Sequence, residues 1–139
     1  MQTYAHRVRS IGFFGLLIIA GCASAGTPSG REGPLELTVY AAGDSLTPTS
    51  VLECGKGELN RMGYRDDQQG ELTYFWKGGL PRREIVLGPI GSRGFAGLWM
   101  SIRTLNPSIL GPTQGAPTVE GEAEAREVIA ICLPEEPAG

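Results

Sequence analysis

Three cysteines, Cys22, Cys54 and Cys132, constrain how this chain of 139 residues can fold. Cys54 and Cys132 lie 78 positions apart, so a bond between them would tie the middle of the chain to its end. Such bonds persist in oxidising compartments and are rare in the cytosol. The use of these cysteines therefore depends on where the chain is delivered, and its first residues bear on that question.

The first 22 residues have the pattern of an export signal. A basic start, with Arg7 and Arg9, precedes an apolar run over residues 11–19. The run is too short for a transmembrane helix, which needs about 20 residues, and it suits the apolar region of a signal peptide. The small residues Ala20 and Gly21 then lead to Cys22.

The stretch Ile18-Ile19-Ala20-Gly21-Cys22 resembles the lipobox of bacterial lipoproteins. The resemblance implies cleavage before Cys22 and anchoring through lipid on Cys22, where several acyl chains hold stably and one alone is marginal. Because Ala23 is not Asp, it also implies the outer membrane facing the periplasm in a Gram-negative cell, and otherwise the cell membrane. The alternative is an ordinary cleaved signal peptide with an incidental cysteine.

Beyond this signal peptide (1–21), we predict a flexible tether (22–34), a single domain (35–133) and a C-terminal tail (134–139). Removing residues 1–21 takes away two arginines and no acid, so the net charge falls from −3 to −5. This negative balance argues against nucleic acid as a partner.

The exported domain would keep Cys54 and Cys132 as an even pair, which predicts one disulfide. Two buried free cysteines are the alternative. No metal or cofactor is expected, because the single histidine, His6, lies in the predicted signal peptide.

Hydrophobic periodicity predicts the secondary structure. Alternating apolar residues predict strands over 35–41, 71–77, 83–87 and 95–105. Thr47-Pro48 and apolar residues at helical spacing predict a helix over 48–62, although Gly55 and Gly57 weaken it. The segments 65–70, 88–94 and 106–118 are predicted as turns or loops.

The segment 119–133 is ambiguous between a helix and a helix followed by a strand. We favour a helix, because it places Cys132 on one apolar face with Ala125 and Val128, where it could meet Cys54 on the other helix. The resulting order, β-α-β-β-β-α, predicts an α+β fold. It consists of a small antiparallel sheet of about four strands with two helices on one face, joined by a helix–helix disulfide.

Gly43-Asp44-Ser45-Leu46 resembles the nucleophile block of GDSL (SGNH) esterases, which implies Ser45 as nucleophile. That family's Asp-x-x-His and Gly-x-Asn-Asp blocks are missing from the sequence. Without a general base a serine is a weak nucleophile. Our preferred interpretation is a turn in which Asp44, Ser45 or Thr47 caps the helix.

Aromatic residues occur at both odd and even positions of the predicted strands, and so on both faces of the sheet. If Leu72, Tyr74 and Trp76 face the helices, then Phe75 points to the opposite side of the sheet, together with Trp99 and, as a further candidate, Tyr40. Phe75 and Trp99 are therefore a candidate partner face, since exposed aromatic patches often contact other proteins.

Two polar features have ordinary interpretations. The bases Lys77, Arg82 and Arg83 would fringe a hairpin, and Asp66-Asp67 would be solvated acids in a turn and no calcium site.

The sequence thus favours a non-enzymatic, lipid-anchored module that contacts a protein partner in the cell envelope. A degenerate GDSL-like hydrolase using Ser45 is the alternative. A small ligand held between sheet and helices is a third hypothesis.

Overall fold

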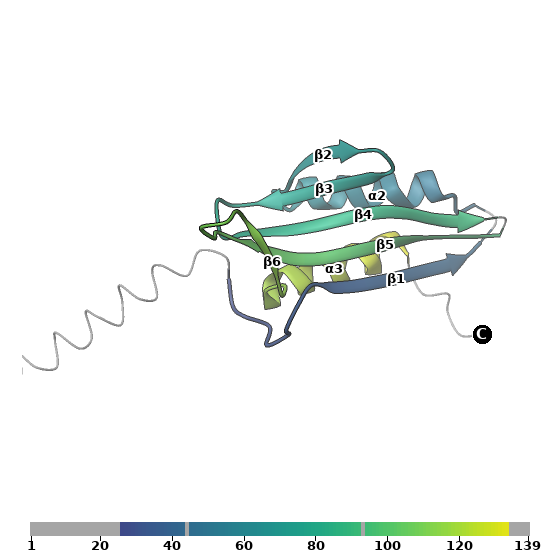
Figure 1. Cartoon of the computed structure of the whole chain (residues 1–139). Coiled ribbons are helices and arrows are strands. Elements are labelled where there is room, and N and C mark those ends of the chain that lie inside the picture. Colours follow the sequence, from purple (N-terminus) through teal and green to yellow (C-terminus); the bar gives the residue numbers. More distant parts are fainter. Residues whose placement is uncertain (1–25, 44, 93, 134–139) are drawn as a thin grey trace, which may run out of the picture.

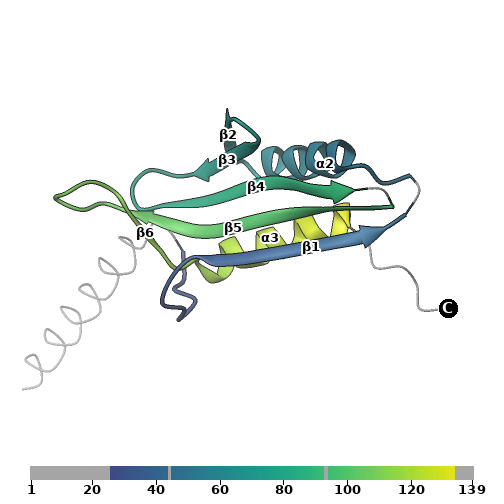
Figure 2. The ribbon, with the colours of Figure 1, turned by 45° about the vertical axis from the view of Figure 1, so that its right-hand side comes forward.

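The computed structural model describes residues 26–43, 45–92 and 94–133. In this part of the chain, a six-stranded antiparallel sheet carries two helices on one face (Figure 1 and Figure 2). The elements occur in the order β1 (Leu35–Ala42), α2 (Pro48–Arg61), β2 (Arg65–Gln69), β3 (Leu72–Lys77), β4 (Arg82–Ser92), β5 (Phe95–Asn106), β6 (Thr113–Gly115) and α3 (Val119–Cys132). The predicted α+β fold is confirmed, with six strands where about four are expected from the sequence.

The strands are arranged in the order β1-β5-β4-β3-β2, and β6 pairs with the end of β5. Strands β2 to β5 form successive hairpins, so each pairs with the next along the chain. β1 pairs with β5 over its whole length and forms one margin of the sheet.

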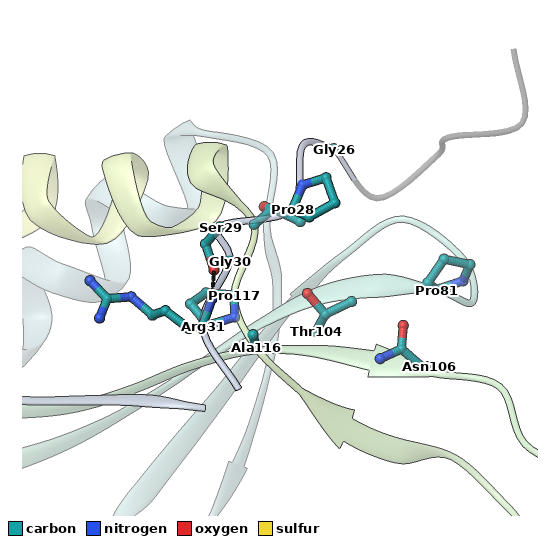
Figure 3. Close-up of a pocket in the computed structure, with 11 residues that line it drawn as sticks. Gly26, Pro28, Ser29, Gly30, Arg31, Pro81, Thr104, Asn106, Ala116 and Pro117 are labelled. Atoms are coloured by element: carbon teal, nitrogen blue, oxygen red, sulfur yellow. Dashed lines mark hydrogen bonds between the residues drawn. The ribbon is translucent and has the colours of Figure 1, made fainter. Parts of the chain in front are cut away.

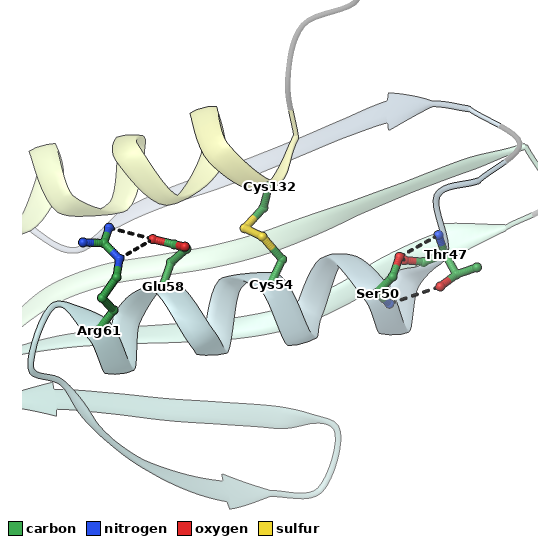
Figure 4. Close-up of a disulfide and its surroundings, with 6 residues drawn as sticks. All are labelled: Thr47, Ser50, Cys54, Glu58, Arg61 and Cys132. Carbon is green, nitrogen blue, oxygen red and sulfur yellow. Dashed lines mark hydrogen bonds and ion pairs between the residues drawn. A yellow bond between two sulfur atoms is a disulfide. The ribbon is translucent and has the colours of Figure 1, made fainter.

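The predicted first helix is confirmed, and its start is well defined. Thr47 Oγ1 accepts from Ser50 N at 3.1 Å, and Ser50 Oγ accepts from Thr47 N at 3.1 Å (Figure 4). This reciprocal capping box satisfies two backbone donors, and Pro48 follows in the first turn, where its missing N–H costs nothing. Gly63, at φ +94°, takes the left-handed conformation just after the helix.

The ambiguous segment near the C-terminus is a helix, α3. Thr118 caps it by accepting from Gly121 N at 3.0 Å. At its last residue, Cys132 is bonded to Cys54 of α2, with the two Cα atoms 5.7 Å apart (Figure 4). The predicted helix–helix disulfide is therefore confirmed.

The core lies between the sheet and the two helices. The strand residues facing the helices are fully buried: Phe75, Ile85, Leu87, Leu98, Met100 and Ile102. Gly55, which weakens the helix prediction, lets α2 approach the sheet, because an added Cβ would lie 3.0 Å from Leu87 Cδ1. This close packing offsets the lower helix propensity of glycine.

Three predicted connections contain strands that the sequence did not predict. The predicted turn over 65–70 contains β2, and most of the predicted loop over 88–94 belongs to β4. β2 is exposed at all five positions, so no apolar alternation marks it. In β4, Gly88 leaves room for Leu72, because an added Cβ would lie 2.9 Å from Leu72 Cδ2. The predicted loop over 106–118 likewise contains the short β6.

The N-terminal segment 26–31 is hydrogen-bonded to the start of α3. Thr27 donates from its backbone N and its hydroxyl to Glu120, both at 2.8 Å, and Arg31 pairs with Glu122 at 2.8 Å. This part of the predicted tether is thus bound to the domain. The predicted signal peptide, residues 22–25 with Cys22, and the tail 134–139 lie outside the described residues. Neither helix of the described ranges is long and apolar enough to cross a bilayer.

Candidate functional site

The face of the sheet away from the helices, here called the helix-free face, is the main candidate site. Both views show the helices behind the sheet, and no helix or strand of the described residues covers the opposite face (Figure 1 and Figure 2). Strand register assigns to this face the residues that alternate with the core positions. Five aromatic residues lie there: Tyr40, Tyr74, Trp76, Phe95 and Trp99.

The sheet face predicted for Tyr40, Phe75 and Trp99 is observed for two of these three residues. Trp99 and Tyr40 lie on the helix-free face, and Tyr40 is 64% exposed. The placement of Phe75 is wrong: it is fully buried against the helices, so Tyr74 and Trp76 take the outer side of β3. Alternation separates the residues of a strand into two faces, but both faces of β3 are apolar, so the sequence pattern could not assign them.

The centre of the helix-free face is a second, smaller apolar layer. Val86 is 1% exposed, yet it lies outside the core cluster under the helices. Leu72 and Trp99 close over neighbouring Gly88, where an added Cβ would lie 2.9 Å from Leu72 Cδ2 and 3.4 Å from Trp99 Cε3. Leu72, Val86 and Trp99 are thus packed in place before any partner binds.

Beside this layer, towards the β3–β4 turn, lies an arginine–aromatic cluster made of Tyr74, Trp76, Arg82, Glu84 and Arg103. Arg103 Nε donates to Glu84 Oε1 at 2.8 Å, and its guanidinium carbon lies 5.8 Å from the Tyr74 ring centre. The Arg82 guanidinium carbon lies 5.4 Å from the Trp76 ring centre, and its Nη2 is 3.5 Å from Glu84 Oε2. The carboxylate is thus held between two guanidinium groups, each near an aromatic ring.

The cluster carries more positive than negative charge. The Glu84 side chain is 7% exposed, whereas that of Arg82 is 31% exposed and can meet a partner. Arg82 Nε is buried and makes no hydrogen bond within the described ranges. Arg65 of β2 lies opposite Trp76 in the register and adds a further exposed guanidinium to this face, balanced by Asp67 opposite Tyr74.

The other end of the helix-free face holds an apolar hollow of about 670 Å³. It is lined by Thr38, Tyr40, Ala42, Ile90, Gly94 and Phe95. The Tyr40 and Phe95 rings are tilted against each other with centres 5.7 Å apart. Aromatic groups therefore lie at both ends of the face.

The remaining bases of the predicted hairpin fringe lie on the helix side. Glu124 of α3 pairs with Arg83 and with Lys77, and it accepts from the Tyr64 hydroxyl at 3.4 Å. Lys77 Nζ also donates to Met62 O at 2.7 Å, close to the end of α2. Burial, reinforced by the charge of Glu124, raises the pKa of Tyr64 well above its ordinary value. This group fastens α3 to the sheet, so we assign it to stability.

A smaller hollow, of about 320 Å³, lies beside the start of α3 (Figure 3). One wall is the N-terminal segment 26–31, and Pro81, Thr104, Asn106 and Pro117 contribute to the others. Thr104 is 6% exposed, and its Oγ1 makes no hydrogen bond within the described residues. The hollow is lined by prolines, by neutral polar side chains such as Thr104 and Asn106, and by Arg31, which is paired with Glu122.

Ser45, the alternative nucleophile, lies exposed in the turn between β1 and α2. Thr47 performs the capping role expected of this turn. The single histidine, His6, and the neighbouring Asp44 lie outside the described residues. Nothing in the described geometry assembles a triad around Ser45.

Asp66 and Asp67 are consecutive in β2 and so point to opposite faces of the sheet. Among residues 26–43, 45–92 and 94–133, no three Cys, His, Asp or Glu side chains are grouped to hold a metal ion.

Comparison with known proteins identifies no relative that shares this site. No protein-family model, curated protein or solved structure matches the chain.

Proposed function

We propose that this chain is a lipid-anchored, non-enzymatic module of the cell envelope that binds a partner protein on its helix-free face. The observation that supports the proposal best is the arginine–aromatic cluster. Tyr, Trp and Arg are the residues enriched at the energetic centres of protein interfaces. Here they are packed against one another on a surface that no element of the described chain covers.

The chemistry of the cluster suggests the partner's chemistry. Arg82 and Arg103 share the single Glu84 carboxylate, so their guanidinium groups can donate hydrogen bonds to a second carboxylate, supplied by a partner. The faces of Trp76 and Tyr74 offer apolar contact area beside that charge. The partner should therefore present a carboxylate next to an apolar side chain.

The location of the module follows from the sequence and fits the disulfide. The lipobox-like stretch ending in Cys22 implies a lipid anchor, and a Cys54–Cys132 bond suits an oxidising compartment. The module would then act close to the membrane surface.

Cross-linking the full-length chain in its native cells and identifying the co-purified proteins tests the proposal. The informative variant is Arg82→Gln. The matched control is Arg61→Gln, which removes the same charge from an exposed side chain of α2. We expect Arg82→Gln to weaken capture about tenfold or more, as for an interface hot spot, while Arg61→Gln retains it.

Two further variants separate the parts of the proposal. Cys22→Ser should reduce capture if anchoring brings module and partner together. Full retention of every co-purified protein by both Arg82→Gln and Trp99→Ala would contradict docking on the helix-free face. Ester turnover that disappears in Ser45→Ala would instead support the hydrolase alternative.

A further inference from the structure

The two margins of the sheet differ in how they resist pairing with another strand. β2, at one margin, is short and reads Arg-Asp-Asp-Gln-Gln, exposed at every position. β1, at the other, has eight residues, of which only Glu36 is charged, with no lysine, proline or bulge in its register. Proteins usually protect edge strands with such features, and an edge without them is a template for pairing.

The side chains of β1 are also incompletely covered. Its helix-side residues Leu35, Leu37, Val39 and Ala41 are half-buried, whereas their neighbours on β5 are fully buried. Within the described part of the chain, β1 pairs only with β5, and its outer margin stands clear in both views (Figure 1 and Figure 2).

We propose that β1 pairs with β1 of a second copy, which joins the two sheets into one continuous antiparallel sheet. A two-fold axis at Thr38 keeps the helices of both copies on the same side. It places all four helix-side apolar residues opposite apolar partners, Leu35 against Ala41 and Leu37 against Val39.

Charge is compatible with this self-pairing. In the same register, Glu36 of each copy faces Tyr40 of the other, so the two carboxylates never meet. In the paired sheet, the apolar hollow of one copy, lined in part by Thr38, Tyr40 and Phe95, would lie next to the same hollow of the other copy. The strand is thus complementary to itself in polarity and charge.

The lipid anchor would favour the pairing further, a point that rests on the proposed function. Two copies held on one membrane surface meet at a raised effective concentration. Because segment 26–31 is held on α3, only residues 22–25 of each copy would form the spacer, which spans at most about 14 Å when extended. The pairing itself rests on the backbone at the outer margin of β1, whereas partner docking is proposed on the helix-free face.

Thiol cross-linking of the full-length chain in cell membranes tests the proposal. Thr38→Cys, treated with a short bis-maleimide, should give a covalent dimer of the chain. The controls are the unmodified chain, which accounts for Cys22, and Gln68→Cys, which puts a thiol on the opposite margin. Absence of a dimer, an equal dimer with Gln68→Cys, or a cross-link from Thr38→Cys to a different protein would overturn the proposal.

A charge exchange gives a second readout that does not depend on cysteine chemistry. Two differently tagged copies should co-purify when unmodified. They should do so about tenfold less when both carry Thr38→Lys or both carry Thr38→Glu, because like charges opposite each other destabilise paired strands. Mixing Thr38→Lys with Thr38→Glu should restore co-purification, which also shows that both variants fold. Undiminished co-purification of two Thr38→Lys copies would refute the pairing.

Discussion

At the scale of single residues, Glu84 is the most demanding position on the helix-free face. Its side chain is 7% exposed, and Arg103 is its closest charge partner. Without Arg103, only Arg82 at 3.5 Å would remain to neutralise it. We therefore expect Arg103→Met to lower the free energy of unfolding by up to about 3 kcal/mol, because the buried carboxylate would keep only the longer contact with Arg82.

The double variant Glu84→Gln/Arg103→Met is the control for this expectation. The double variant should lose clearly less free energy of unfolding than Arg103→Met, because no buried charge is left without its partner. Urea unfolding of the full-length chain measures both losses. Equal losses for the single and double variants would mean that Arg103 acts through packing on Tyr74, with its charge contributing little.

The same residue scale shows where sequence reasoning reached its limit at the site. The alternation of Trp99, Ser101 and Arg103 groups these residues on one face of β5, and the structure places them together on the helix-free face. The misplacement of Phe75 has a physical cause. Tyr74 and Trp76 are as apolar as Phe75, and only the packing of the helices decides which set is covered.

At the scale of elements, the close approach of β1 to β5 depends on Gly97. A Cβ at this position would lie 2.2 Å from Val39 O and 2.6 Å from Tyr40 Cβ, and a backbone oxygen cannot turn aside. We expect Gly97→Ala to destabilise the fold by about 1–3 kcal/mol, the range for overpacking. Gly57→Ala is a matched control, because this exposed helical glycine has no atom within 4 Å of an added Cβ. It should stabilise by up to about 1 kcal/mol. Thermal unfolding measures both variants. Melting temperatures that shift in the same direction would contradict this account.

The disulfide belongs to the same scale, because it joins α2 to α3 across 78 positions of sequence. Closing a loop of this length in the unfolded chain is worth about 4–5 kcal/mol in the chain-entropy model. We expect Cys54→Ala/Cys132→Ala to lose a large part of that stability, measured by urea unfolding without reductant. Adding reductant should destabilise the unmodified chain by a similar amount and leave the variant unchanged. A reductant effect on the variant would point to a different cause.

Elements with a buried side are the ones that the sequence predicts well. β1, β3, β5 and both helices have apolar periodicity, because each has one face against the core. β2 and β6 escape prediction because they are polar and exposed, and pair only through their backbones. The end of β4 is not predicted, because Gly88, Pro89 and Gly91 have low strand propensity. Pairing with β5 holds these residues in the strand.

At the scale of the whole molecule, segment 26–31 determines how the domain would be joined to the proposed lipid anchor. While Thr27 and Arg31 hold this segment on α3, the hollow beside Thr104 keeps one of its walls, and only the residues before Gly26 can act as a spacer. Releasing the segment would lengthen that spacer and open the hollow. Besides the backbone hydrogen bond from Val119 to Thr27, the contacts that hold the segment end on the carboxylates of Glu120 and Glu122, so acid should weaken its attachment.

The direction of this pH dependence follows from the two carboxyl groups. Hydrogen bonds from Thr27 lower the pKa of Glu120, which also faces Arg83, and Arg31 followed by Arg126 lowers that of Glu122. Because both are lowered from 4.5, their contribution is fully present above that value and is lost as the pH falls through the lowered pKa values. The amide of Val119, which donates to Thr27 O at 2.8 Å, reports the contact. Its hydrogen-exchange protection should fall in acid before that of the core strands. In Glu120→Gln/Glu122→Gln it should be low at every pH. Val119 protection that persists until the whole domain unfolds would show that the segment is held by other contacts.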